Sequence, residues 1–205
     1  MLFRSPVPGE DALVWCIGPP LHGSFRTFVG SDELANRAVA LYRERFRDIG
    51  LYENEAYAGI DETLAKVAAT GRRLFVATSK PKIYADRIVE HFGLRRHFEH
   101  VFGSELDGTR ADKADLLAYA LAEAKADPVR AIMVGDRSHD VIGARKNGMT
   151  AIGVLYGYGS LEELTNAGAH HLCAAHPDVV PHCAASGDKT LAELNPGALV
   201  SPSAD

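Results

Sequence analysis

The sequence predicts an α/β fold in which helices cover both faces of a parallel sheet. From Tyr57 onward, short apolar runs alternate with helix-like segments, which is the order of elements that a parallel sheet requires. The run 131–135 is continuous and apolar, as expected of a strand buried on both faces, and Asp136 follows it directly. Residues 1–57 lack this alternation and have helical patterning. We therefore expect a three-layer domain with a smaller helical part ahead of it.

Two segments carry the helical prediction. A short helix is expected over 21–28, after a proline pair, and a second begins near Asp32 and Glu33, because acids stabilise a helix N-terminus. Gly50 ends the second helix. Its apolar stripe is formed by Leu34, Ala38, Leu41, Tyr42, Phe46 and Ile49.

The alternating region divides into strands and helices separated by turn residues. Strands are expected at 74–77, 99–103, 131–135, 150–154 and 170–173. Helices are expected at about 60–70, 81–93, 113–125, 138–147 and 161–167. The domains are then 1–57 (helical), 58–180 (α/β) and 181–205, a tail rich in Pro, Gly, Ser and Ala without periodicity, which we expect to be poorly ordered.

Composition excludes several classes of function. A net charge of −5 without a basic stripe argues against a nucleic-acid partner. Every apolar run is too short to span a membrane, and the N-terminus lacks the apolar stretch of a signal peptide, so no membrane partner is expected. The 3 cysteines are odd in number and share no Cys-x-x-Cys spacing, which indicates a cytoplasmic protein.

Three polar clusters are expected at the sheet edge where α/β proteins bind ligands. Thr78 and Ser79 follow a strand and precede a helix, so their hydroxyls and free N–H groups suit an anion. Lys113 opens a helix, where its charge opposes the helix dipole unless an anion lies nearby. Asp136 and Asp140 follow the strand 131–135 and form a hard oxygen site suited to Mg²⁺.

Each cluster also has a structural explanation when it is considered alone. Thr78 and Ser79 suit a helix cap, and Asp136 and Asp140 suit an N-cap and a first-turn acid. Lys113 alone is compatible with a solvated surface lysine. The order of the clusters along the chain is more specific than any one of them.

That order resembles the haloacid dehalogenase superfamily of phosphohydrolases, with Thr78 in its second motif, Lys113 in its third, and Asp136 and Asp140 in its fourth. The chain looks most like the phosphoglycolate phosphatase-like branch with a helical cap, and the match covers roughly residues 11–175. The stretches that carry this closer resemblance are 17–21, 77–81, 106–110 and 153–159.

The resemblance implies a Rossmann-like core and a Mg²⁺-dependent phosphatase acting on a small phosphorylated metabolite. Thr78, with Ser79 beside it, would hold phosphate oxygens, and Lys113 would neutralise phosphate and nucleophile. Asp136 would ligate Mg²⁺, with Asp140 assisting or orienting. In this family an aspartate attacks phosphorus, and a second aspartate two positions later acts as acid and base.

The sequence departs from the family at that nucleophile. The family begins with an apolar strand and Asp-x-Asp-Gly-Thr, whereas here the matching region starts inside the cap. We therefore expect a truncated helical cap over 1–57, a core over 58–180 that lacks its first strand, and an impaired or inactive phosphatase. The alternative is a non-catalytic protein that binds phosphate or Mg²⁺, or that acts through its exposed sheet edges. A dehalogenase is less favoured, since it needs the same nucleophile.

Two segments resemble the missing parts. Residues 105–109 imitate the nucleophile motif, but they precede Lys113 where the family has a similar loop. The absent strand would lie between the strands ending at Thr78 and Asp136, and 12–17 could fill that gap. We expect 12–17 in the cap instead.

Overall fold

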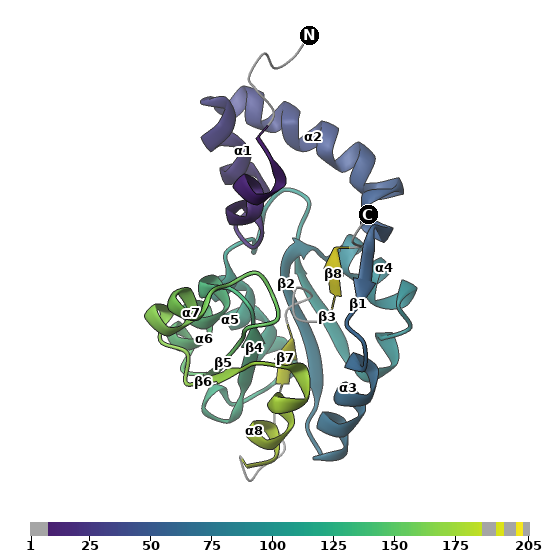
Figure 1. Cartoon of the computed structure of the whole chain (residues 1–205), viewed down its shortest axis with the longest axis vertical. Coiled ribbons are helices and arrows are strands. Elements are labelled where there is room, and N and C mark those ends of the chain that lie inside the picture. The colour runs from purple at the N-terminus through teal and green to yellow at the C-terminus, as the bar shows by residue number, and fades with distance from the viewer. Residues whose placement is uncertain (1–7, 186–191, 195–199, 203–205) are drawn as a thin grey trace.

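A cap of short helices lies over one end of the molecule (Figure 1). The structure is a computed structural model, and it describes residues 8–185, 192–194 and 200–202. The cap contains a 3₁₀ helix, η1 (Glu10–Cys16), followed by α1 (Leu21–Val29) and α2 (Asp32–Asp48). Ser31 caps α2 by accepting the Leu34 N–H at 3.3 Å. Residues 12–16 are thus part of a cap helix, as expected.

The core contains a six-stranded parallel sheet with the order β3-β2-β7-β4-β5-β6. Its strands are β2 (Leu74–Pro81), β3 (His100–Ser104), β4 (Ile132–Gly135), β5 (Thr150–Val154), β6 (His171–Cys173) and β7 (Ala192–Leu194). The core helices are α3 (Ile60–Ala69), α4 (Lys82–His91), α5 (Lys113–Ala124), α6 (Ser138–Lys146), α7 (Leu161–Ala167) and α8 (Val179–Ala185). Short 3₁₀ turns are η2 (Gly50–Tyr52), η3 (Arg95–His97), η4 (Pro128–Arg130) and η5 (His176–Asp178).

Alternate residues of the strands pack on opposite faces of this sheet. Val76 and Val134 join the apolar cluster that includes α3, α4 and α8, whereas Phe75 and Met133 join the cluster that includes α5, α6 and α7. All of these side chains are buried, which explains the continuous apolar runs in the sequence. The three-layer α/β fold is confirmed.

The centre of the sheet and the tail differ from what the sequence led us to expect. The place between β2 and β4 is filled by β7, which runs parallel to both strands, with Leu194 level with Val76 and Val134. Without an occupant, both neighbours would leave backbone N–H and C=O groups unpaired in the middle of the sheet.

The tail 181–205 is therefore not irregular throughout. Besides β7, it contains most of α8 and the strand β8 (Val200–Pro202), which pairs antiparallel with β1 (Asn54–Ala56). The strands β7 and β8 were missed because three residues are too few to show a period, and the strands with which they pair are distant in sequence. Among the described helices, none is both long and apolar enough to cross a membrane.

Candidate active site

The cap and the carboxyl ends of β2 and β4 enclose a cavity of about 610 Å³. All of the site residues expected from the sequence line it: Thr78, Ser79, Lys113, Asp136 and Asp140. Cap residues from 16 to 22 and from α2 close the opposite side. The three polar clusters, distant in sequence, therefore meet in one cavity, at the sheet edge where ligands of α/β proteins bind.

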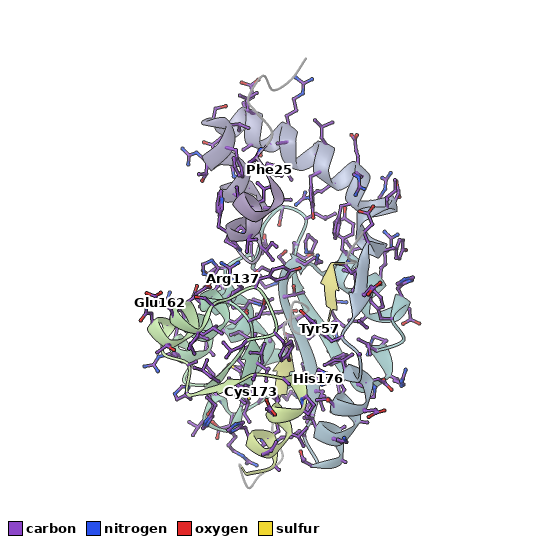
Figure 2. The ribbon with its side chains drawn as sticks, in the orientation of Figure 1. Phe25, Tyr57, Arg137, Glu162, Cys173 and His176 are labelled. Atoms are coloured by element: carbon purple, nitrogen blue, oxygen red, sulfur yellow. The ribbon has the colours of Figure 1, made fainter. Side chains whose placement is uncertain are left out.

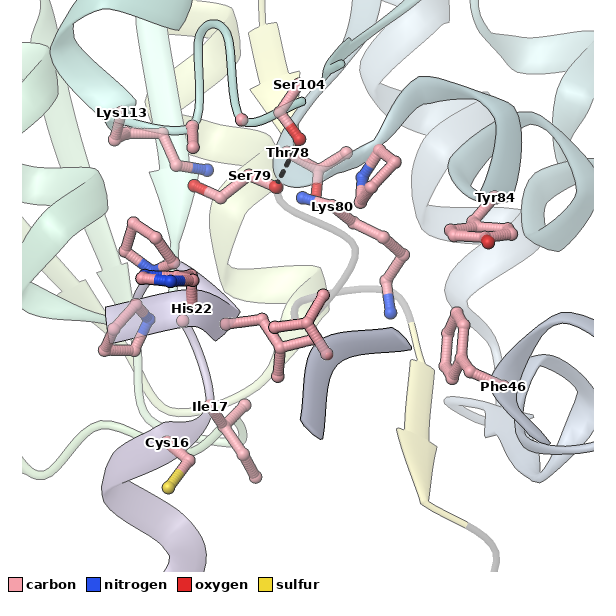
Figure 3. Close-up of a pocket in the computed structure, with 18 of the residues that line it drawn as sticks. Cys16, Ile17, His22, Phe46, Thr78, Ser79, Lys80, Tyr84, Ser104 and Lys113 are labelled. Atoms are coloured by element: carbon pink, nitrogen blue, oxygen red, sulfur yellow. Dashed lines mark hydrogen bonds between the residues drawn. The ribbon is translucent and has the colours of Figure 1, made fainter. Parts of the chain in front are cut away.

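Thr78 and Ser79 lie in the last part of β2, where its register becomes irregular ahead of α4. The Lys80 N–H donates to the Thr78 Oγ1 at 3.1 Å, so the threonine hydroxyl proton remains available for an anion. The Ser104 hydroxyl donates to the Ser79 carbonyl at 2.8 Å and ties this part of β2 to β3 (Figure 3). Thr78 is buried, so its orientation is fixed by the fold.

Lys113 is held by two oxygens from different elements. Its ammonium donates to the Ala77 carbonyl at 3.0 Å and pairs with the Asp140 Oδ1 at 2.9 Å. Lys113 and Asp140 are both buried. The anion that the sequence required beside this first-turn lysine is thus Asp140, on the neighbouring helix α6.

Asp140 has a second structural role. Its Oδ2 accepts the Arg137 N–H at 3.2 Å, which satisfies a free backbone donor at the start of α6. Gly135 makes room for this carboxylate, because a Cβ there would lie 2.4 Å from the Asp140 Cβ. The geometry makes Asp140 a residue that orients Lys113 and caps its own helix.

Asp136 is clamped by the loop that follows β5. The Tyr158 N–H donates to the Asp136 Oδ2 at 2.9 Å. A Cβ on Gly157 would lie 2.3 Å from the Asp136 Cβ, so only glycine permits this approach. Burial raises the pKa of the Asp136 carboxyl, and the charge of Asp140 raises it further, whereas the Tyr158 N–H lowers it.

Two buried carboxylates with one lysine suit a cation. Mg²⁺ binds through one or two carboxylates and keeps several waters, which matches Asp136 with Asp140 behind it. Within the described residues, no group of three or more His, Cys, Asp or Glu side chains could hold a metal ion.

The segment 105–109, which imitates the nucleophile motif, forms an exposed loop at the edge of the cavity. Glu105 lines the cavity but forms an ion pair with Arg110. Asp107 accepts the Thr109 N–H at 2.8 Å, and that bond lowers the pKa of the Asp107 carboxyl. Both side chains are exposed. That this loop supplies no nucleophile stays a prediction.

Arg137 joins the cap to the core. Its Nε donates to Glu163 of α7 at 2.9 Å, and its Nη1 donates to the Ile17 carbonyl. The side chain lies at the junction beneath the cap (Figure 2). Arg137 therefore pairs with an acid and a cap carbonyl, and this fixes η1 and its following turn over the cavity.

Lys80 and Tyr158 are site residues to which the sequence analysis assigned no role. Lys80 lines the cavity with its ammonium 4.5 Å from the centre of the Phe46 ring, and Tyr158 supplies the N–H on Asp136. Lys80 stands two positions after Thr78, so its place beside the second motif was the available signal. Tyr158 acts through its backbone, for which side-chain chemistry gives no signal.

Comparison with known proteins identifies the family. The model of the haloacid dehalogenase-like hydrolase family matches residues 3–154. A 5′-nucleotidase of Pseudomonas aeruginosa is 47% identical over 159 residues, which cover 77% of this chain and 72% of that protein. The tyrosine-protein kinase PtkA of Mycobacterium tuberculosis is 43% identical over 155 residues, 76% of this chain, and the chain spans about half of PtkA (53%).

A solved structure extends the match to three dimensions. The crystal structure of a predicted phosphatase from Clostridium acetobutylicum superposes with a TM-score of 0.82 at 40% identity, covering 86% of this chain and 82% of that one. These similarities, together with the cavity that unites Thr78, Lys113 and Asp136, support a phosphatase function. The chain belongs to the haloacid dehalogenase-like hydrolase family.

Proposed function

We propose that this chain carries a Mg²⁺-dependent phosphatase site of the phosphoglycolate phosphatase type, which binds a small phosphomonoester and turns it over slowly or not at all. The observation that supports this most directly is the meeting of Thr78, Lys113 and Asp136 in one cavity. A hydroxyl, an ammonium and a buried carboxylate pair are the groups that a phosphate with its metal ion requires.

Thr78 and Lys113 would bind the phosphate, and Asp136 and Asp140 would hold the metal ion. The Thr78 hydroxyl donates to a phosphate oxygen, with its direction fixed by the bond that Oγ1 accepts from the Lys80 N–H. The Lys113 ammonium, held by Ala77 and Asp140, places a positive charge beside that phosphate. Asp136 would hold Mg²⁺, with Asp140 behind it, and the ion would supply charge neutralisation at the phosphoryl group.

Slow or absent turnover follows from the carboxylates in the cavity. Among the described residues that line it, the acids other than Asp136 and Asp140 are Glu105 and Asp107, whose carboxylates are engaged within their own loop. Phosphoryl transfer through an aspartyl-phosphate needs a free carboxylate facing phosphorus. A non-catalytic protein that binds phosphate or Mg²⁺ is the second candidate function, and this engagement of Glu105 and Asp107 favours it.

Calorimetric titration with orthophosphate, with and without Mg²⁺, tests the binding site separately from turnover. We expect Mg²⁺-dependent phosphate binding that Asp136→Asn weakens by at least about tenfold. Asp86→Asn, outside the cavity, is the control. No phosphate binding by the wild-type chain would refute the proposal.

The phosphatase assay decides between the two candidates, with phosphoglycolate and a nucleoside 5′-monophosphate as substrates. Slow release of phosphate that Asp136→Asn abolishes supports the impaired phosphatase. Binding without any turnover supports the non-catalytic candidate. Rapid turnover abolished by Asp136→Asn would show that the chain contains an effective nucleophile and would refute the impairment.

A further inference from the structure

The cavity has a second cationic end, distant from the phosphate-binding residues. Figure 3 shows the Lys113 ammonium beside Thr78 and Ser79, and the Lys80 ammonium at the other side, next to Phe46 and Tyr84. Lys113 is neutralised by Asp140, whereas no described carboxylate forms an ion pair with Lys80. A volume of about 610 Å³ leaves room for much more than one phosphate.

Aromatic side chains hold Lys80 in this position. Its ammonium lies 4.5 Å from the Phe46 ring centre, and the Phe46 ring stacks on Tyr42 with centroids 5.2 Å apart. Tyr84 meets the Phe46 ring edge-on at 5.4 Å. The cation–π contact offsets part of the cost of burying the ammonium, but it brings no negative charge.

A second cation, Arg43, lines the cavity near Phe46. Arg43 lies one helical turn before Phe46 on α2 and lines the same cavity. No ion pair to a described carboxylate involves it. Lys80 of β2 and Arg43 of α2, neither of which pairs with an acid among the described residues, give this part of the cavity a positive potential.

From this juxtaposition we propose that Lys80, supported by Phe46 and Tyr84, forms a subsite for a second anionic group on the ligand, at the end of the leaving group away from the phosphate. The proposal rests on the proposed function, because the first anion is held by Thr78 and Lys113. An anion is favoured over an aromatic base, since the Phe46 ring already contacts Tyr42, Tyr84 and the ammonium.

The electrostatics of Lys80 agree with this assignment. Burial lowers the pKa of Lys80 to about 8, so the chain bears a cost for keeping this ammonium charged. A carboxylate or phosphate beside it would remove that cost and form a charge-assisted hydrogen bond. The subsite thus gains affinity only from ligands that bring a negative charge to this end.

Calorimetric titration with phosphonates tests the subsite without requiring turnover. The probes are alkylphosphonates of increasing chain length, each paired with the equally long phosphonate that ends in a carboxylate. At one length we expect the carboxylate to tighten binding by about tenfold in the wild-type chain. We expect Lys80→Met to abolish this gain, and Lys80→Arg to retain it.

Lys82→Met is the matched control, because Lys82 pairs with Asp86 at 2.5 Å and does not line the cavity. A series that ends in a second phosphonate separates the two sources of charge, and a gain from either terminal anion that depends on Lys80 supports the subsite. Equal affinities with and without the terminal anion, or a gain that survives Lys80→Met, would overturn it.

The failures of the two proposals are distinguishable. If no alkylphosphonate binds, the proposed phosphate site is refuted, and the proposed Lys80 subsite is refuted with it. If the alkylphosphonates bind but no terminal anion adds affinity, only the subsite is refuted. The subsite would also be refuted if a nucleoside 5′-monophosphate bound more tightly than every probe with a terminal carboxylate or second phosphonate, and Lys80→Met left that affinity unchanged.

Discussion

Lys113 begins a helix whose dipole disfavours a cation at that end, yet its side chain is buried. The compensation comes from other elements, because Ala77 of β2 accepts one hydrogen bond and Asp140 of α6 supplies the charge. The pair costs desolvation of both groups and is stabilising only while both partners are present. Lys113 and Asp140 therefore act as one unit.

Loss of either Lys113 or Asp140 alone should lower the free energy of unfolding strongly, whereas loss of both should cost less than the sum of the two single losses. We expect Lys113→Met to lower the free energy of unfolding by about 3 kcal/mol, because Asp140 remains buried without its cation. In the double variant Lys113→Met/Asp140→Asn the loss should be smaller than the sum of the single losses by about 1–3 kcal/mol. Urea unfolding of the four chains measures this coupling, and additive losses would contradict it.

Lys80 should give stability a characteristic pH dependence. Its pKa is about 8 in the folded chain and near 10.5 when unperturbed, so between these values the unfolded chain binds more protons. Stability therefore rises with pH across this window. Relative to Lys80→Met, the wild-type chain should gain on the order of 2 kcal/mol between pH 7 and pH 10.5. Urea unfolding at both pH values tests this, and parallel pH profiles would contradict it.

Residue types and their order were enough to find the cluster of Thr78, Lys113 and Asp136, because each carries a side chain with the required chemistry. Residue types and their order did not predict the role of Lys80, because that role depends on the cavity beside its ammonium and on Phe46 from the cap. They were also not enough for Arg137, since its partners Glu163 and Ile17 belong to distant elements.

At the scale of elements, the loop after β5 does more than border the cavity. Tyr158 holds Asp136 through its backbone N–H, and Tyr156 accepts the Tyr57 hydroxyl at 2.9 Å through its carbonyl. Tyr57 lies between the cap and α3, so the loop joins this connection to the carboxylate. The position of Asp136 thus depends on two segments outside its own strand.

Gly157→Ala tests this clamp. The added Cβ would lie 2.3 Å from the Asp136 Cβ, so the loop or the carboxylate must move. We expect Mg²⁺-dependent phosphate binding to weaken by at least about tenfold, measured by calorimetric titration. Gly23→Ala is the control, because nothing lies within 4 Å of a Cβ there, and alanine within α1 should keep or raise stability. Unchanged binding in Gly157→Ala would contradict the clamp.

The elements with strong periodicity were the predictable ones. The expected helix 161–167 coincides with α7, and the expected strands at 74–77 and 150–154 correspond to β2 and β5. The three-residue strands β7 and β8 were missed, because neither has a pattern of its own and both form only by pairing with β2, β4 and β1. Their existence is a property of the assembled sheet.

At the scale of the whole molecule, the C-terminal strand completes the sheet. β7 pairs with β2 and β4, the two strands whose ends carry Thr78 and Asp136. β8 pairs with β1, between the cap and α3. The strands β7 and β8 therefore contact both strands of the site and the connection to the cap (Figure 1).

A chain that ends at residue 185 tests whether this closure stabilises the molecule. It keeps α8 but leaves the facing edges of β2 and β4 without a partner, so unpaired backbone groups and flat strand edges are exposed. We expect the thermal unfolding midpoint to fall by about 5–10 °C, and size-exclusion chromatography to show self-association. A chain ending at Pro202 retains β7 and β8 and should behave as the full chain does. If the shorter chain instead stays monomeric with an unchanged midpoint, β7 contributes nothing to the stability of the sheet, and the closure inferred from its position is wrong.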